Sequence, residues 1–205
     1  NAVLPAETPT KEALLEKTFI RSNGQLVFDR QPDANIMTFN DNVEIKKGSS
    51  TVFSYKLVVF FDPQTKQTKQ AIASGNVLAS QGTKIAKGGF LTWDVNTQSA
   101  ILEDIQKAEF VKDDLSIDAL KMIFYKDTGK IDVPSSGSLR VRHKGETDKK
   151  KTLANADETD NNISVKWEGK MNFLDDTREA NFEKNIEVQR ENSTLLCDNL
   201  NVTFD

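Results

Sequence analysis

The side chains that most often carry catalysis or bind metals are few in this chain. His143 is the single histidine and lies in a lysine-rich segment, and Cys197 is the single cysteine. A nucleophilic triad or a zinc site needs several such side chains converging on one point. We therefore predict no catalytic site and no metal site. Cys197 lies in a segment of alternating polar and apolar residues, so we expect it to be a buried structural thiol.

Paired carboxylates occur at Glu103–Asp104, Asp113–Asp114 and Asp175–Asp176. Two carboxyl groups in one pocket could act as general acid and base or bind calcium. Each pair falls in or beside a predicted turn, where aspartate commonly accepts hydrogen bonds from nearby backbone. The local role is therefore favoured over the catalytic one. The segment Lys87–Gly89 is too short for a phosphate-binding loop, and no cofactor is predicted.

The composition narrows the class of protein further. The chain has 12 Phe but only 2 Tyr, which favours dry aromatic packing. Two interpretations follow: a Phe-filled core, or an apolar tunnel or groove. The net charge is −4 with both signs mixed along the chain, so no basic stripe for nucleic acid is present. The longest apolar run, Leu57 to Phe61, is too short to span a membrane.

Alternation with a period of two dominates the chain. Leu57, Val59 and Phe61 fall on one face of an extended segment, and polar residues alternate with similar apolar residues elsewhere. One dry and one wet face are typical of an antiparallel sheet folded over an apolar interior. The sequence therefore predicts an all-β, antiparallel fold.

An internal repeat supports this prediction. Residues Glu179 to Asp205 align without a gap with Ile36 to Asp62, and nine of the 27 positions are identical. Upstream, Gly24–Phe28 matches Gly169–Phe173 after a short length change in a turn. An aromatic residue closes each alternating run, and a polar turn follows it. We interpret the chain as repeated strand–turn–strand units. The closing aromatics are Phe28, Phe61, Trp93, Phe124, Phe173 and Phe204.

Two segments depart from the repeat. Residues 1–19 form an N-terminal extension, with a short helix predicted over Lys11–Lys17 after Thr10 as N-cap. The segment from His143 to Asn162 is rich in Lys, Asp, Thr and Asn, and we predict a long polar loop there, at about 143–162. The repeat domain is predicted to cover residues 20–205.

The repeat segments resemble those of the OstA-like family, which comprises the periplasmic lipopolysaccharide-transport proteins LptA and LptC and the N-terminal domain of LptD. In that family a Gly-Asn-Val strand starts a unit, as in Ala73–Gly82, and a strand ending in an aromatic or aliphatic residue follows, as in Phe90–Asp94. Asn42–Ile45 and Asn185–Val188 are similar to the first element. The resemblance covers most of Ile20 to Asp205.

The resemblance implies a twisted antiparallel β-jellyroll whose apolar interior holds acyl chains. It also implies a non-enzymatic, periplasmic protein of the cell envelope that binds lipopolysaccharide or another acylated lipid. Its protein partners would be other OstA-like domains or a second copy, joined end to end by strand pairing. Any targeting signal or anchor is expected upstream of Asn1. The candidate lipid contacts are Phe39, Phe61, Leu91, Trp93, Phe124, Met171, Phe173 and Phe182.

Two alternatives stay open at this point. The same residues could touch one another in a closed core, and the chain would then be a structural scaffold that binds protein partners by edge-strand addition, without lipid. An enzyme with a carboxylate site would require two carboxyl groups to meet inside a pocket.

Overall fold

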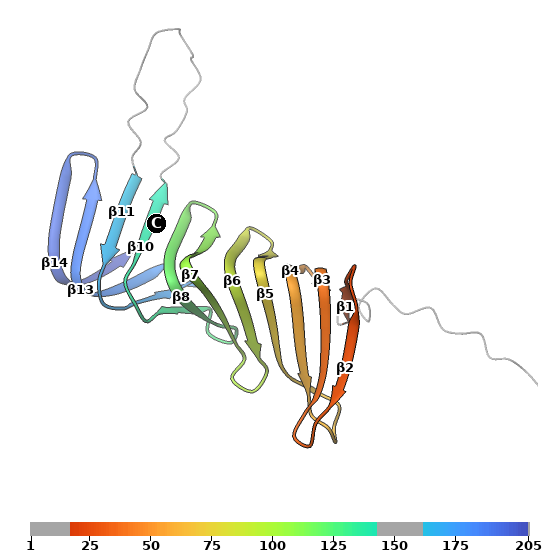
Figure 1. The fold of residues 1–205 in the computed structure, drawn as a ribbon. Coiled ribbons are helices and arrows are strands. Elements are labelled where there is room, and N and C mark those ends of the chain that lie inside the picture. The colour runs from red at the N-terminus through yellow and green to blue at the C-terminus, as the bar shows by residue number, and fades with distance from the viewer. Residues whose placement is uncertain (1–16, 143–161, 205) are drawn as a thin grey trace, which may run out of the picture.

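The computed structural model describes residues 17–142 and 162–204, which contain fourteen β-strands in one antiparallel sheet. Figure 1 shows the strands side by side, running from β1 at one end of the molecule to β14 at the other. The predicted all-β antiparallel fold is confirmed. The strands are β1 (Thr18–Arg21), β2 (Leu26–Arg30), β3 (Asn35–Lys47), β4 (Ser50–Phe61), β5 (Thr68–Gln81), β6 (Lys84–Asp94), β7 (Ser99–Lys112), β8 (Leu115–Tyr125), β9 (Lys130–Val133), β10 (Gly137–Arg142), β11 (Asn162–Trp167), β12 (Met171–Leu174), β13 (Glu179–Arg190) and β14 (Ser193–Thr203).

Some predictions fall on segments outside this description. The predicted helix over Lys11–Lys17 lies outside it except for Lys17, which is in neither a helix nor a strand. The predicted polar loop lies outside it except for Asn162, which begins β11. The first strand begins at Thr18, two residues before the predicted start of the repeat domain. No helix within residues 17–142 and 162–204 is long and apolar enough to cross a membrane.

Most of the long strands bend near their middle, where the pairing register shifts. In β3, β5 and β13 the bend falls on Asn42, Asn76 and Asn185, with φ of 48°, 49° and 48°. The residue before each asparagine also has positive φ. Asparagine and glycine adopt this left-handed conformation at lower cost than other residues, and two such residues in a strand form a bulge. The sequence therefore places the bends where Gly75–Asn76 and its counterparts occur.

This location corrects one expectation. The resemblance places the Gly-Asn-Val element at the start of a unit, whereas the structure places Gly75 and Asn76 inside β5. The expectation was wrong because asparagine marks both turns and bulges, and both need the same backbone conformation.

The bends divide the sheet into two arms that fold toward each other, as in a jellyroll. At three places a short non-strand segment replaces the bend: residues 22–25 separate β1 from β2, 134–136 separate β9 from β10, and 168–170 separate β11 from β12. Arm I comprises 26–30, 35–40, 56–61, 68–74, 90–94, 99–103, 121–125, 130–133, 171–174, 179–183 and 199–203. Arm II comprises 18–21, 43–47, 50–54, 77–81, 84–88, 108–112, 115–119, 137–142, 162–167, 186–190 and 193–197.

The internal repeat corresponds to two equivalent structural units. β1–β4 form the first unit and β11–β14 form the second, with the same pairings around β3 and β13. Gly24 and Gly169 occupy matched positions at the bend. A Cβ on either would collide with a backbone carbonyl oxygen, of Asn40 or of Glu183. Both glycines are thus explained by the same close approach of two chain segments.

The turns at the tips of arm I use the predicted chemistry. The Asp62 carboxylate accepts hydrogen bonds from the backbone N–H groups of Gln64 and Thr65, at 2.9 and 2.8 Å. Asp94 accepts equivalent bonds from Asn96 and Thr97, at 2.9 and 3.0 Å. These two repeats therefore end in the same type of aspartate-capped turn.

Candidate apolar binding surface

The predicted candidate residues lie on one face of the sheet. Residues paired directly across antiparallel strands point to the same face. One row of such pairs runs through Leu26, Phe39, Leu57, Ala73, Leu91, Leu102 and Met122. A second row runs through Phe28, Met37, Val59, Ala71, Trp93, Ala100, Phe124, Ile131, Phe173, Ala180 and Val202. Met171 and Phe182 face each other on this side, and Phe61 lies two residues beyond Val59. The rows form a continuous apolar face of arm I.

The structure nevertheless divides these residues between two clusters. The C-terminal cluster contains Met171, Phe173 and Phe182 among its fully buried members, and Leu91 and Phe124 pack against it. The N-terminal cluster has only five buried residues, Val43, Leu57, Val59, Ala73 and Val77, and Phe39, Phe61 and Leu91 pack against it while partly exposed. Trp93 is partly exposed and belongs to neither cluster.

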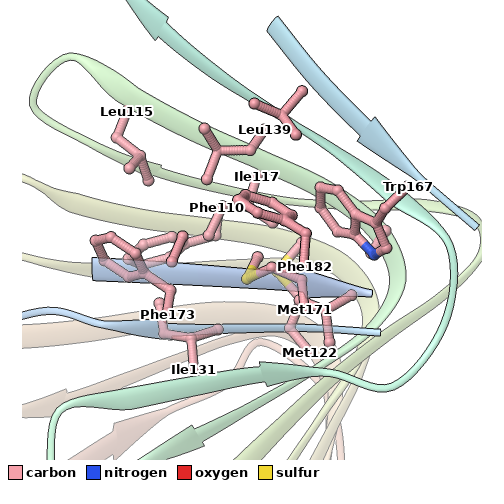
Figure 2. Close-up of a cluster of buried hydrophobic side chains, with 14 of the residues drawn as sticks. Phe110, Leu115, Ile117, Met122, Ile131, Leu139, Trp167, Met171, Phe173 and Phe182 are labelled. Atoms are coloured by element: carbon pink, nitrogen blue, oxygen red, sulfur yellow. The ribbon is translucent and has the colours of Figure 1, made fainter. Parts of the chain in front are cut away.

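The C-terminal cluster is a packed core. Phe110 of arm II meets Phe124 of arm I with ring centroids 5.2 Å apart, and Trp167 of arm II meets Phe182 of arm I at the same distance. The Trp167 indole N–H donates a hydrogen bond to the Ser135 carbonyl at 2.9 Å. Figure 2 shows Phe110, Trp167 and Phe182 packed between the arms together with Met122, Met171 and Ile131. Aromatic pairs of this kind contribute about 0.5–1.5 kcal/mol beyond area burial.

The N-terminal half exposes the same type of side chain that the C-terminal half buries. Phe28 and Phe173 occupy matched repeat positions, yet Phe28 is 47% exposed and Phe173 only 2%. Leu26 is 54% exposed, whereas its counterpart Met171 is 1% exposed. These apolar side chains point toward the interior of the fold but find little to pack against.

Three members of this exposed surface were missed as candidates from the sequence: Leu26, Phe28 and Met37. The alternation pattern places Leu26 and Phe28 on the apolar face. Their match to Met171 and Phe173 in the repeat is the signal that could have identified them as candidate lipid contacts. We define the N-terminal apolar surface as Leu26, Phe28, Met37, Phe39, Phe61 and Trp93.

A separate hollow of about 350 Å³ lies at the bend of β3, β4 and β5. Its lining includes the exposed side chains of Phe53 and Tyr55.

Several carboxylates in the described part of the chain accept hydrogen bonds from nearby backbone or pair with lysine and arginine. Asp104 accepts hydrogen bonds from the backbone of Gln106 and Lys107, the local role that the sequence predicts. These bonds hold the pKa of its carboxyl below the usual value. Within the described ranges no three His, Cys, Asp or Glu residues are placed to hold a metal ion. Cys197 packs against the C-terminal cluster but is only partly buried, so it is more exposed than the buried structural thiol that the sequence predicts.

Asp175 behaves differently from the other turn carboxylates. It accepts a hydrogen bond from Lys84 at 2.7 Å and another from Lys112, both on arm II. Burial raises its pKa, but the hydrogen bonds and charges of the two lysines outweigh burial and hold the pKa below the usual value. Three residues on, Arg178 pairs with Asp114 at 3.1 Å. Sequence reasoning assigned these carboxylates to local turns and missed the contacts between the arms.

Comparison with known proteins identifies the family of the chain. No curated protein matches the chain. Among solved structures, LptH, described as the LptA homologous periplasmic component of the lipopolysaccharide transport device of Pseudomonas aeruginosa, matches with a TM-score of 0.45 and 11% identity over 54% of this chain and 77% of that chain. The family model described as LptA/(LptD N-terminal domain) LPS transport protein matches residues 27–130, half of the 205 residues. The chain therefore belongs to the LptA and LptD N-terminal domain family of lipopolysaccharide transport proteins.

Proposed function

We propose that this chain is a non-enzymatic, periplasmic lipid-binding component of lipopolysaccharide transport. On this proposal the acyl chains of lipopolysaccharide lie on the N-terminal apolar surface. The observation that carries the proposal is the contrast between matched positions: Leu26 and Phe28 are about half exposed where Met171 and Phe173 are buried. A row of inward apolar side chains without a packing partner is the kind of surface that an acyl chain would cover.

The energetics suit reversible binding. Burial of one methylene group stabilises a complex by about 0.8 kcal/mol, so eight methylenes would supply roughly 6 kcal/mol before the cost of ordering the lipid. The half-exposed aromatics would gain burial as well. Because the hydrophobic effect is non-directional, the surface needs no particular polar group to hold an alkyl chain.

The protein partners would join at the two ends of the sheet. Among the residues that the structure describes, β14 pairs with β13 alone, and β1 and β2 pair with β3 alone, so each of these strands has one edge that no described strand covers. In the second unit the strands matched to β1 and β2 are β11 and β12, and β10 and β9 cover their edges. Free edges accept additional strands readily. This supports end-to-end pairing with another domain of the family or with a second copy.

Site-specific photocrosslinking to lipopolysaccharide tests the lipid proposal. A photoreactive residue at Phe28 is expected to crosslink, whereas one at Val27 is not. Val27 is a matched control, because it is the next residue on β2, is 42% exposed, and points to the opposite face. Crosslinking of equal yield at both positions, or at neither, in a folded protein would contradict the proposal and favour the scaffold alternative.

A further inference from the structure

The tips of the two arms are joined over the C-terminal cluster by one turn. Asp175 and Arg178 belong to the turn between β12 and β13, at the tip of arm I. Their partners lie at the tip of arm II: Lys84 begins β6, Lys112 ends β7, and Asp114 lies in the turn before β8. Each ion pair joins a residue of arm I to a residue of arm II, so these pairs form only when the tips of the two arms lie close together. We call these five residues the clasp.

The clasp is tied into the fold on both sides. The Asp175 side chain is only 10% exposed, and its backbone N–H donates a hydrogen bond to the Gly129 carbonyl in the neighbouring tip. The Arg178 guanidinium donates to both carboxylate oxygens of Asp114, at 3.1 and 3.3 Å. The Phe204 N–H in turn donates to the Arg178 carbonyl. Ion pairs that are partly buried and part of a network are worth more than isolated surface pairs.

The clasp has no counterpart over the N-terminal cluster. In the part of the chain that the structure describes, the three ion pairs that join the tips of the two arms all involve Asp175 or Arg178. The ion pairs near the N-terminal end stay within one arm, such as Lys69–Asp62 and Lys46–Glu44. Behind the clasp, Phe173, Phe110 and Leu115 are buried, whereas Phe28 is half exposed.

We propose that the clasp, with the aromatic core behind it, is the end wall of the lipid-binding surface. Acyl chains bind along the N-terminal apolar surface, stop at the clasp, and enter and leave only through the N-terminal half. Lipid does not pass along the whole length of the molecule while the clasp is closed. This inference rests on the proposed function, and it specifies how far along the interior that function extends. The clasp residues 175 and 178 lie outside the segment that the family model matches, residues 27–130.

The three methionines of the chain provide the test, because they sample both regions from the inward face. Met37 lies opposite Phe28 and Val59 on the partly exposed surface. Met122 and Met171 are fully buried in the C-terminal cluster. Replacing all three by photo-methionine places a nearly isosteric photoreactive group at each position of one protein. After irradiation with purified lipopolysaccharide, mass spectrometry would assign the lipid adducts to individual methionines.

We expect adducts at Met37 and none above background at Met122 or Met171. Adducts of comparable yield at all three positions would overturn the end wall and leave the proposed function intact. Absence of adducts at Met37 as well would overturn the proposed function itself, so the two failures are distinguishable.

A clasp variant then tests the ion pairs. In Asp175→Asn/Arg178→Gln, we expect adducts at Met171 to rise at least fivefold while those at Met37 stay unchanged. Glu109→Gln is the matched control, because it removes an ion pair with Lys87 that lies within arm II, and its adduct pattern should equal that of the unmodified protein. Folding of each variant is checked by circular dichroism, and the single variant Asp175→Asn replaces the double variant if that one unfolds. Unchanged labelling of Met171 in a folded clasp variant would overturn the role of the clasp.

Discussion

The first and last repeat units of this molecule have nearly the same strands but different interiors. In the unit β1–β4 the inward side chains of β2 remain half exposed, whereas in the unit β11–β14 those of β12 are buried. The residue types hardly differ: Leu26 and Phe28 correspond to Met171 and Phe173. The difference comes from the neighbours: β9 and β10 cover β12 and β11, whereas no strand among residues 17–142 and 162–204 covers the corresponding edges of β2 and β1. Side-chain chemistry therefore sets which face is apolar, and the surroundings set whether that face is filled.

The largest expected effect separates the two units by stability. Phe173→Ala should lower the free energy of unfolding by about 3–5 kcal/mol, because it leaves a cavity in a packed core. Phe28→Ala should cost about 1 kcal/mol or less, because that side chain is already half exposed. Urea denaturation followed by circular dichroism measures both. Equal losses in the two variants would contradict the division into a packed and an unfilled region.

The next effect runs in the opposite direction and concerns binding. Leu26→Ser should weaken lipopolysaccharide binding about tenfold, since loss of about 1.4 kcal/mol of apolar contact changes affinity by that factor. Its effect on unfolding should stay small. Fluorescence titration with labelled lipopolysaccharide provides the measurement, and Val27→Ser on the other face of β2 is the control. An unchanged affinity in Leu26→Ser would show that the N-terminal apolar surface is not part of the binding site.

The clasp should make the C-terminal unit sensitive to acid. The pKa of Asp175 in the folded chain is held below its ordinary value of 3.8 by Lys112 and Lys84 despite burial. Because the folded pKa is lower than the unfolded one, this carboxylate stabilises the fold above about pH 4, and that contribution is lost as the pH falls through the folded pKa. Asp175→Asn should therefore reduce the loss of stability below pH 4, measured by urea denaturation at several pH values. A variant with the same acid dependence as the unmodified chain would count against the clasp.

The smallest effect concerns the free edge of β14. If two copies pair end to end, the mass measured by analytical ultracentrifugation should rise with concentration. The substitutions Leu195→Lys and Leu196→Lys should reduce that association. Both leucines are exposed on β14, and charged side chains on an edge strand disfavour pairing with another strand. A chain that stays monomeric at all concentrations would rule out self-pairing.

The sequence carried enough information for the strands and the inward face. Alternation identified Leu57, Val59 and Phe61, and the repeat located hairpins that the structure has as β3–β4 and β13–β14. Turn chemistry at Asp62 and Asp94 was also readable, because each aspartate directly follows the closing aromatic and caps its own turn.

The ion pairs that join the two arms over the C-terminal cluster could not be predicted from the sequence in the same way. They depend on Lys84 and Asp114 meeting the turn of Asp175 and Arg178, and neither periodicity nor spacing relates residues so far apart. One departure from the repeat could have given a signal. Leu174 stands directly after Phe173, where four of the other five copies have aspartate, and Asp175 follows one position later. With that shift, the carboxylate of Asp175 accepts hydrogen bonds from Lys84 and Lys112 of the other arm.

The left-handed asparagines at the bends of β3, β5 and β13 have a consequence for how such a chain can grow. Each bend is specified by two residues within its own strand, so the cross-section does not depend on the number of strands beside it. Duplication of a hairpin would extend the molecule along its long axis by about 9.6 Å, which is two inter-strand spacings, and would leave the angle between the arms unchanged. The number of hairpins therefore sets the length of the molecule, and insertion or deletion of whole hairpins would change that length in equal steps without changing the cross-section.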